Sequence, residues 1–167
     1  MITFFIRLSV FREASMRVAR VAFVTTLVCL GSTLSYAAPD WAVAVFPSGE
    51  EFSLEIAADD ESRAYGYMYR EKIAANEGML FIFDQPGPYT FWMRNCKIAL
   101  DIIWLDEGLR VVEIAHDQKP CPDDGECPSV GPMRAARYVI EVAGGTAKRE
   151  GLEVGDRMTI LAEPALP

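Results

Sequence analysis

Short apolar runs separated by turn residues make up most of the chain from residue 41 onward. The segment 51–57 alternates cleanly, with Phe52, Leu54 and Ile56 on one side and charged or small polar residues on the other. Alternation of this kind predicts a half-buried antiparallel strand. Other runs rich in aromatic and β-branched residues predict strands at 41–46, 79–83, 89–93, 102–105, 109–115, 136–142 and 157–161.

The period of the apolar residues becomes helical after residue 59. Asp60 is placed to cap a helix of about three turns, on which Ala64 and Met68 stack. Gly66 lies inside this predicted helix, and we expect it to permit close packing against a strand. Thr146 is placed to cap a second, short helical turn that ends at Gly151.

Many short strands with one or two short helices predict a mainly β fold with an α+β tendency. We expect a compact, antiparallel β-sandwich or barrel-like single domain. The segment 117–134 contains four prolines and two glycines, so we expect a long loop there.

The first 37 residues have the pattern of a secretory signal peptide. Arg17 and Arg20 precede an apolar run at 21–30, and Ser35-Tyr36-Ala37 is a small-x-small cleavage site. An apolar run of about ten residues is too short to span a bilayer. The pattern predicts cleavage after Ala37 and an exported, periplasmic domain at 38–167, with no stable membrane insertion after cleavage. Translation from either Met1 or Met16 would supply a complete signal.

Charge narrows the range of partners. The chain of 167 residues has a formal net charge of −8. Removal of residues 1–37 takes away four basic residues and one acidic residue, which leaves 12 basic and 23 acidic residues and a net charge of −11. Because such a chain repels nucleic acid and anionic membranes, we expect no nucleic-acid partner.

Three cysteines remain after cleavage, and two of them lie in the predicted long loop. In an oxidising compartment Cys121 and Cys127 are expected to form a disulfide that staples this loop. A zinc site with Cys121, Cys127 and His116 is an alternative, and it would need Asp117 or Cys96 as the fourth ligand. A redox-active pair is a further alternative. We expect no metal and no cofactor.

Several sequence blocks carry a resemblance to a known family. They are Arg63–Arg70, Gly78–Phe83, Phe91–Asn95, Leu100–Trp104, Pro120-Cys121, Cys127-Pro128, Tyr138–Glu141 and Gly151–Asp156. In these blocks the chain resembles the DUF192 family of small, often exported prokaryotic proteins. The resemblance implies a compact, mostly β domain and brings no agreed reaction or substrate. The family usually has Thr or Ser in place of Cys96 and Pro in place of Ala99, which argues against a nucleophilic cysteine.

Polar residues embedded in these apolar blocks are the candidate site residues. If the arginines converge with Asn95, their guanidinium groups would bind a carboxylate or phosphate. The alternative is a buried pair of Asp101 with Arg94 or Arg70 that holds strand ends together. The residues that we select as ligand-binding candidates are Arg63, Arg70, Trp92, Arg94, Asn95 and Asp101.

Aromatic residues near this set allow a second kind of pocket. One interpretation is that they line a site for a sugar or an apolar ligand, and the alternative is that they only pack in the hydrophobic core. These residues are Tyr89, Phe91, Trp92 and Trp104. His116 is the only histidine, and no serine has a nucleophile context, so Ser-His-Asp catalysis has no support.

These observations predict a binding protein. The site is a cleft beside Arg94 and Asn95 for a small, possibly anionic ligand or an envelope partner. We expect Arg63 and Arg70 to face this cleft and the Cys121–Cys127 loop to form one wall. One alternative is an enzyme that uses Asp101 as a base with arginine support. The other is a structural or accessory envelope protein with a large exposed apolar patch.

Overall fold

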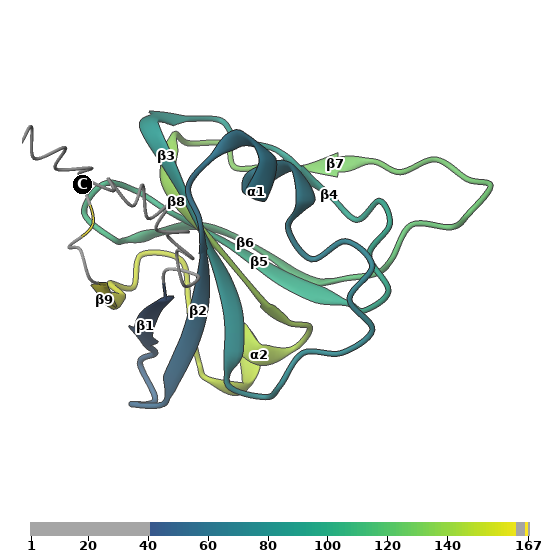
Figure 1. Cartoon of the computed structure of the whole chain (residues 1–167). Coiled ribbons are helices and arrows are strands. Elements are labelled where there is room, and N and C mark those ends of the chain that lie inside the picture. The colour runs from purple at the N-terminus through teal and green to yellow at the C-terminus, as the bar shows by residue number, and fades with distance from the viewer. Residues whose placement is uncertain (1–40, 163–165, 167) are drawn as a thin grey trace, which may run out of the picture. The chain divides into compact units, whose positions relative to one another are not determined.

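One large sheet organises the domain. The computed structural model describes residues 41–162 and residue 166, so the predicted signal peptide lies outside the described residues. Seven strands pair in the order β6-β5-β8-β3-β2-β1-β9, and β4 and β7 form a separate two-stranded sheet (Figure 1). The strands are β1 Trp41–Val45, β2 Glu51–Ala57, β3 Glu77–Gly87, β4 Phe91–Trp92, β5 Leu100–Leu105, β6 Val111–Gln118, β7 Ser129–Val130, β8 Ala136–Ala143 and β9 Thr159–Ala162.

The sheet is mixed, because one of its strand pairs is parallel. Strand β2 has the predicted bounds and pairs antiparallel with β1, but it pairs parallel with β3, in a register that sets Ser53 opposite Glu77. The segment 58–76, with the helix α1 (Asp60–Tyr65), crosses over between these two strands. A crossover connection of this length is what a parallel pair requires. The other pairs in this sheet are antiparallel.

The two outer strands meet at one end of the sheet, which gives it a barrel-like closure. The backbone N–H of Val111 donates to the carbonyl of Asp156 at 2.8 Å, and the N–H of Gly155 donates to the carbonyl of Val111 at 2.8 Å. The N–H of Met158, directly before β9, donates to the carbonyl of Leu109, two residues before β6, at 2.9 Å. The mostly β, barrel-like expectation is therefore confirmed.

Apolar side chains cover both faces of the inner strands. Successive residues of a strand point to opposite faces. Leu80 and Ile140 accordingly belong to one buried cluster, while Phe81 and Val139 belong to the other. The first cluster packs against the helix α2 (Thr146–Arg149) and the second against the segment that follows α1. Glu141 follows Val139 by two residues, so its side chain lies on the second face.

The first helix is shorter than predicted. Asp59, rather than Asp60, is the N-cap, and its carboxylate accepts a hydrogen bond from the backbone N–H of Ser62 at 2.9 Å. The helix ends at Tyr65 because Gly66 has a φ of 48°, which no helical residue adopts. The prediction of three turns is therefore wrong. Close packing of Gly66 against a strand is confirmed, since an added Cβ atom would meet the Phe81 ring at 3.3 Å.

The remaining predictions differ from the structure mainly at element ends. Gly145, rather than Thr146, is the N-cap of α2. The strand expected at 89–93 is reduced to β4, because its partner β7 offers only Ser129 and Val130 inside the predicted long loop. Neither α1 nor α2 has the length or apolar character of a membrane-spanning helix, within the described residues.

Candidate functional site

A buried carboxyl group lies on the second face of the sheet. Glu141 belongs to β8, an inner strand, and its register partners Met79 and Ile102 are apolar. The residue is only 5% exposed, and within the described residues its Oε2 atom has no hydrogen-bond partner. Burial removes the carboxylate from water and raises the pKa of Glu141 to about 8, although the nearby Arg70 guanidinium lowers it in part. The carboxyl group is therefore mostly protonated at neutral pH.

Glu141 lies in the wall of a cavity of about 320 Å³, which we call the aromatic pocket. The walls come from α1 and the turn after it, from β3, and from β4 with the residues that precede it. Half of the lining residues are aromatic. The full set is Arg63, Ala64, Tyr65, Gly66, Tyr67, Met68, Phe81, Phe83, Tyr89, Thr90, Phe91, Trp92, Cys96 and Glu141.

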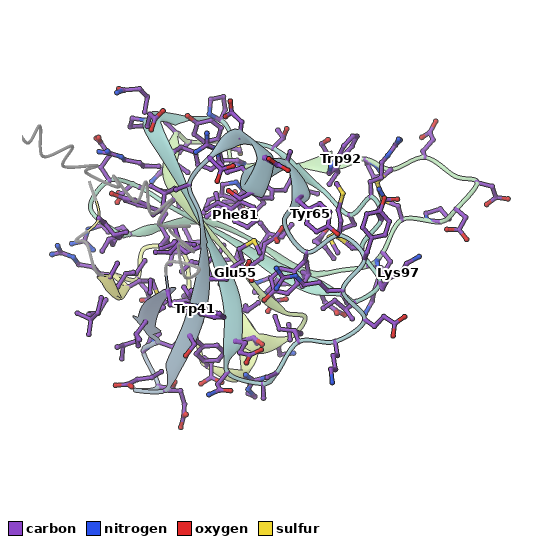
Figure 2. The ribbon with its side chains drawn as sticks, viewed as in Figure 1. Trp41, Glu55, Tyr65, Phe81, Trp92 and Lys97 are labelled. Atoms are coloured by element: carbon purple, nitrogen blue, oxygen red, sulfur yellow. A yellow bond between two sulfur atoms is a disulfide. The ribbon has the colours of Figure 1, made fainter. Side chains whose placement is uncertain are left out.

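Ring contacts hold the walls of the aromatic pocket. Phe81 and Phe91 meet edge to face with centroids 4.9 Å apart, and Phe83 stacks on Tyr89 at 3.5 Å. Trp104 is fully buried behind Phe91, with its indole N–H donating to the carbonyl of Tyr89 at 2.8 Å. Figure 2 labels Phe81, Tyr65 and Trp92 on this side of the sheet. Such contacts fix the positions of the rings, so the pocket is preformed.

Arg63 borders the aromatic pocket, but its donors are committed to the protein. The guanidinium donates to the carbonyls of Ala58 and Ile82 at 2.5 and 2.8 Å and pairs with Asp60 at 2.6 Å. It also lies over the Phe83 ring, 5.4 Å from the centroid. These bonds anchor α1 to the end of β2 and to β3. Arg63 therefore holds one wall in place.

Arg70 lies outside the aromatic pocket and forms an ion pair with Glu55 at 2.7 Å. Its guanidinium covers the ring of Tyr67, 4.9 Å from the centroid. Burial raises the pKa of the Tyr67 hydroxyl above its usual range, although Arg70 lowers it in part, so that group stays neutral. The ion pair between Arg70 and Asp101 that the sequence suggested is absent, because Arg70 pairs with Glu55 instead.

A second cavity, which we call the polar cleft, lies beside the first. It measures about 380 Å³ and is lined by Arg94, Asn95, Cys96, Lys97, Pro120, Cys121, Pro122, Asp123, Gly125 and Cys127. The Arg94 guanidinium lies over the Trp92 ring at 4.8 Å, which places it between the two cavities. Within the described residues, neither Arg94 nor Lys97 forms an ion pair.

Asn95 shapes the border of the polar cleft through its backbone. Its φ of 59° is left-handed, a conformation that asparagine tolerates better than most residues. In that position its carbonyl accepts a hydrogen bond from the N–H of Tyr69 at 2.8 Å. This bond ties the turn after α1 to the segment after β4, and so it connects the aromatic pocket to the polar cleft.

Asp101 lies in neither cavity. It is fully buried at the start of β5, and its carboxylate accepts hydrogen bonds from three backbone N–H groups. These belong to Asp117 at 2.7 Å, Gly145 at 2.9 Å and Ala147 at 2.7 Å. The suggested pair with Arg94 or Arg70 is therefore wrong. Asp101 joins β5, the end of β6 and the start of α2.

The cysteines show the expected disulfide. Cys121 and Cys127 are bonded to each other, so neither is a thiolate ligand, and the zinc alternative is wrong. In the part of the chain that the structure describes, no cluster of His, Cys, Asp and Glu side chains is suited to a metal ion. Cys96 is a free, buried thiol that borders both cavities. Burial, together with the nearby Glu141, raises its pKa to about 11.

The structure thus separates the residues that the sequence grouped together. Arg94 and Asn95 share the polar cleft with the disulfide loop, whereas Arg63 and Trp92 border the aromatic pocket. Arg70 and Asp101 border neither of them. Sequence reasoning missed Glu141. The available signal was a single carboxylate within the otherwise apolar run 138–143.

Comparisons with known proteins place the chain in a family. The family model DUF192, described as an uncharacterized ACR, matches residues 43–160, and the chain therefore belongs to this family. No curated protein matches the chain significantly.

Two solved structures share the fold. A crystal structure of a protein from Sinorhizobium meliloti, described as a candidate transcription regulator, has a TM-score of 0.66 and 28% identity. The match covers 77% of this chain and 96% of that one. A protein of unknown function from Novosphingobium aromaticivorans has a TM-score of 0.64 and 32% identity, and the match covers 71% of this chain and 83% of that one.

Proposed function

We propose that this protein binds a small molecule in the aromatic pocket. The observation that carries the proposal is Glu141, a buried carboxyl group whose Oε2 atom has no partner within the described residues. Leaving a buried polar atom unpaired costs about 1–3 kcal/mol, and a ligand would remove that cost by bonding to it. A preformed, largely apolar cavity with a few polar groups of perturbed pKa is the usual form of a ligand site.

The polar cleft is a second candidate site, for an anionic group. Arg94 and Lys97 border it without carboxylate partners within the described residues, in a chain whose net charge is −8. Guanidinium and ammonium groups left free in this way bind carboxylates or phosphates. The cleft adjoins the aromatic pocket at Cys96, so a ligand with an acidic end would reach both cavities.

An enzyme built on Asp101 is not part of this proposal, because three backbone N–H groups already occupy its carboxylate. The description of the Sinorhizobium meliloti structure as a candidate regulator names no ligand. The acidic charge of this chain argues against nucleic-acid binding. The alternative of an accessory envelope protein predicts no small-molecule ligand and contact through exposed aromatic residues such as Trp92, Tyr65 and Tyr69.

We further propose that the domain works outside the cytoplasm, after export and cleavage at Ala37. The signal pattern of residues 1–37 supports this placement, and so does the disulfide, since such bonds persist in oxidising compartments. Intact mass of the protein from its own cells would test it. A chain that begins at Ala38 is expected, and a chain that retains residues 1–37 would contradict export.

A fragment screen by ligand-observed NMR tests the binding proposal. Ala64 is exposed on α1 and borders the aromatic pocket, so Ala64→Phe should fill the pocket without disturbing the core. Ala74 is equally exposed and borders none of the described cavities, which makes Ala74→Phe the matched control. We expect fragments that bind the wild type and Ala74→Phe but not Ala64→Phe. Fragments that bind all three proteins alike, or no fragments at all, would contradict the proposal.

A further inference from the structure

We propose that the ligand of the aromatic pocket is an organic cation, with an ammonium group at Glu141 and an apolar body against the aromatic rings. This inference rests on the proposed binding function and names the chemical class of the ligand. It comes from the combination of one buried, unpartnered carboxyl group with walls that are half aromatic.

The rings favour a positive charge. Aromatic faces attract cations through the ring quadrupole, and pockets that bind ammonium groups are commonly built from several such faces. Arginine side chains already lie over three rings beside this pocket, those of Phe83, Tyr67 and Trp92, at 5.4, 4.9 and 4.8 Å from their centroids. The protein therefore uses the same interaction at the border of the cavity.

The carboxyl group favours a donor. An ammonium N–H that reaches Oε2 of Glu141 would supply its missing hydrogen bond and, with the carboxylate ionised, a charge-assisted one. The Arg63 guanidinium does not take this role, because its donors bind Ala58, Ile82 and Asp60. The net charge of −8 also raises the local concentration of cations near the protein.

Binding of a cation would release a proton. Glu141 is mostly protonated in the free protein at neutral pH, so its O–H bond breaks, the proton goes to solvent, and the carboxylate pairs with the ammonium group. The other groups that face Glu141 keep their charges between pH 6 and 8. Burial raises the pKa values of the Tyr67 hydroxyl and the Cys96 thiol, so both remain neutral.

One further titratable group lies in the same row of the sheet: Glu55 on β2, the register partner of Met79, which forms an ion pair with Arg70. The register partners of Glu141 are Met79 on β3 and Ile102 on β5, and both are apolar. Across the pocket the charged residue is Arg63. The pH dependence of cation binding between pH 6 and 8 therefore reports on Glu141.

Three probes of one shape test the inference: benzylammonium, benzyl alcohol and benzoate, titrated into the protein at pH 6 and pH 8. Benzylammonium stays charged over this range. We expect it to bind at least about 10-fold more tightly than benzyl alcohol at pH 8, as a charge-assisted contact should. Its affinity should rise about 50-fold from pH 6 to pH 8, as the ionised fraction of a group with a pKa of about 8 does. Benzoate should bind least.

Two variants test whether the preference for benzylammonium and its pH dependence come from Glu141. Glu141→Gln should lose the preference for benzylammonium and its pH dependence while benzyl alcohol binds as before. Glu51→Gln, which removes the same charge at an exposed position, should behave as the wild type. If Glu141→Gln fails to fold, calorimetry of the wild type in buffers of different ionisation enthalpy gives the same information. It should report nearly one proton released per benzylammonium bound at pH 6.

The outcomes separate this inference from the binding proposal. The inference of a cationic ligand would be wrong if benzyl alcohol or benzoate bound as tightly as benzylammonium, or if the affinity for benzylammonium did not change with pH. Either result would still support a ligand pocket. The absence of binding by all three probes would overturn both.

Discussion

Gly66 lies directly against the carboxyl group of Glu141: a Cβ atom added to Gly66 would be 3.6 Å from Oε2 of Glu141. The same Cβ atom would be 3.3 Å from the Phe81 ring. The turn that ends α1 therefore closes over the buried carboxyl group, and it does so with a backbone conformation that only glycine adopts easily. This turn brings the helix, β3 and β8 together into one pocket.

Gly66→Ala should destabilise the protein for two reasons, its positive φ and the crowding by Phe81 and Glu141. Strained backbone of this kind costs on the order of 1–3 kcal/mol, measured as a loss in the free energy of unfolding in urea. Gly49→Ala is the control, since Gly49 also has a positive φ but has no atom within 4 Å of an added Cβ. A loss no larger than that of Gly49→Ala would show that the close packing at Gly66 has no energetic weight.

The stability of the protein should depend on the ionisation of Glu141. Its pKa is raised in the folded state, to about 8 from 4.5, so the folded state binds the proton more tightly than the unfolded state. The stability contribution is complete below about pH 4.5 and is lost as the pH rises to 8. The loss should be on the order of 3–5 kcal/mol.

Urea unfolding of the wild type and Glu141→Gln at pH 5 and pH 8.5 measures this loss. Between pH 5 and pH 8.5 the free energy of unfolding should fall in both proteins or in the wild type alone. The fall should be several kcal/mol larger in the wild type than in Glu141→Gln. The variant should therefore be the more stable protein at pH 8.5. Equal changes in the two proteins would mean that the carboxyl group of Glu141 finds a partner or water in the folded state.

Asp101→Asn should damage the fold rather than a binding site. The substitution replaces one carboxylate oxygen by an amide NH₂, which would face a backbone N–H of Asp117, Gly145 or Ala147. A buried donor without an acceptor costs about 1–3 kcal/mol, and the loss of charge-assisted bonds adds to it. A drop in melting temperature is expected. Unchanged stability with altered ligand binding would instead support a direct role of Asp101 in a site.

Cys96 should be unreactive in the folded protein. Its thiol is buried, and its pKa of about 11 leaves little thiolate at pH 8. In a chain that begins at residue 38, iodoacetamide at pH 8 should label no cysteine before unfolding and one after unfolding without reductant. Rapid labelling of the native protein would show that the thiol is open to solvent. Two further labels should appear only after reduction of Cys121–Cys127.

The sequence predicted the strands well wherever one face is apolar and the other polar. Segment 51–57 is the clearest case, because Phe52 and Leu54 are buried while Glu51 and Ser53 are exposed. The length of α1 was not predictable from the spacing of Ala64 and Met68. The helix ends at Gly66, which has a positive φ and lies against Phe81, a residue distant in sequence.

The candidate site was less predictable for a related reason. Glu141 shares a strand face with Arg137 and Val139. Two charged residues on one face are typical of an outward face, and here the turn with Gly66 and Tyr67 covers Glu141. Arg63 and Arg70 are separated from Arg94 because each of the two bonds to groups near it. Arg70 binds Glu55, and Arg63 binds the backbone beside α1.

The most direct test of the proposed function is native mass spectrometry of the protein purified from its own cells, compared with Ala64→Phe produced in the same way. We predict an additional mass, from one small molecule, on the wild type and its absence from the variant in which the pocket is filled. Gentle activation should release this mass and identify it. The same additional mass on both proteins, or on neither, would contradict a ligand in the aromatic pocket.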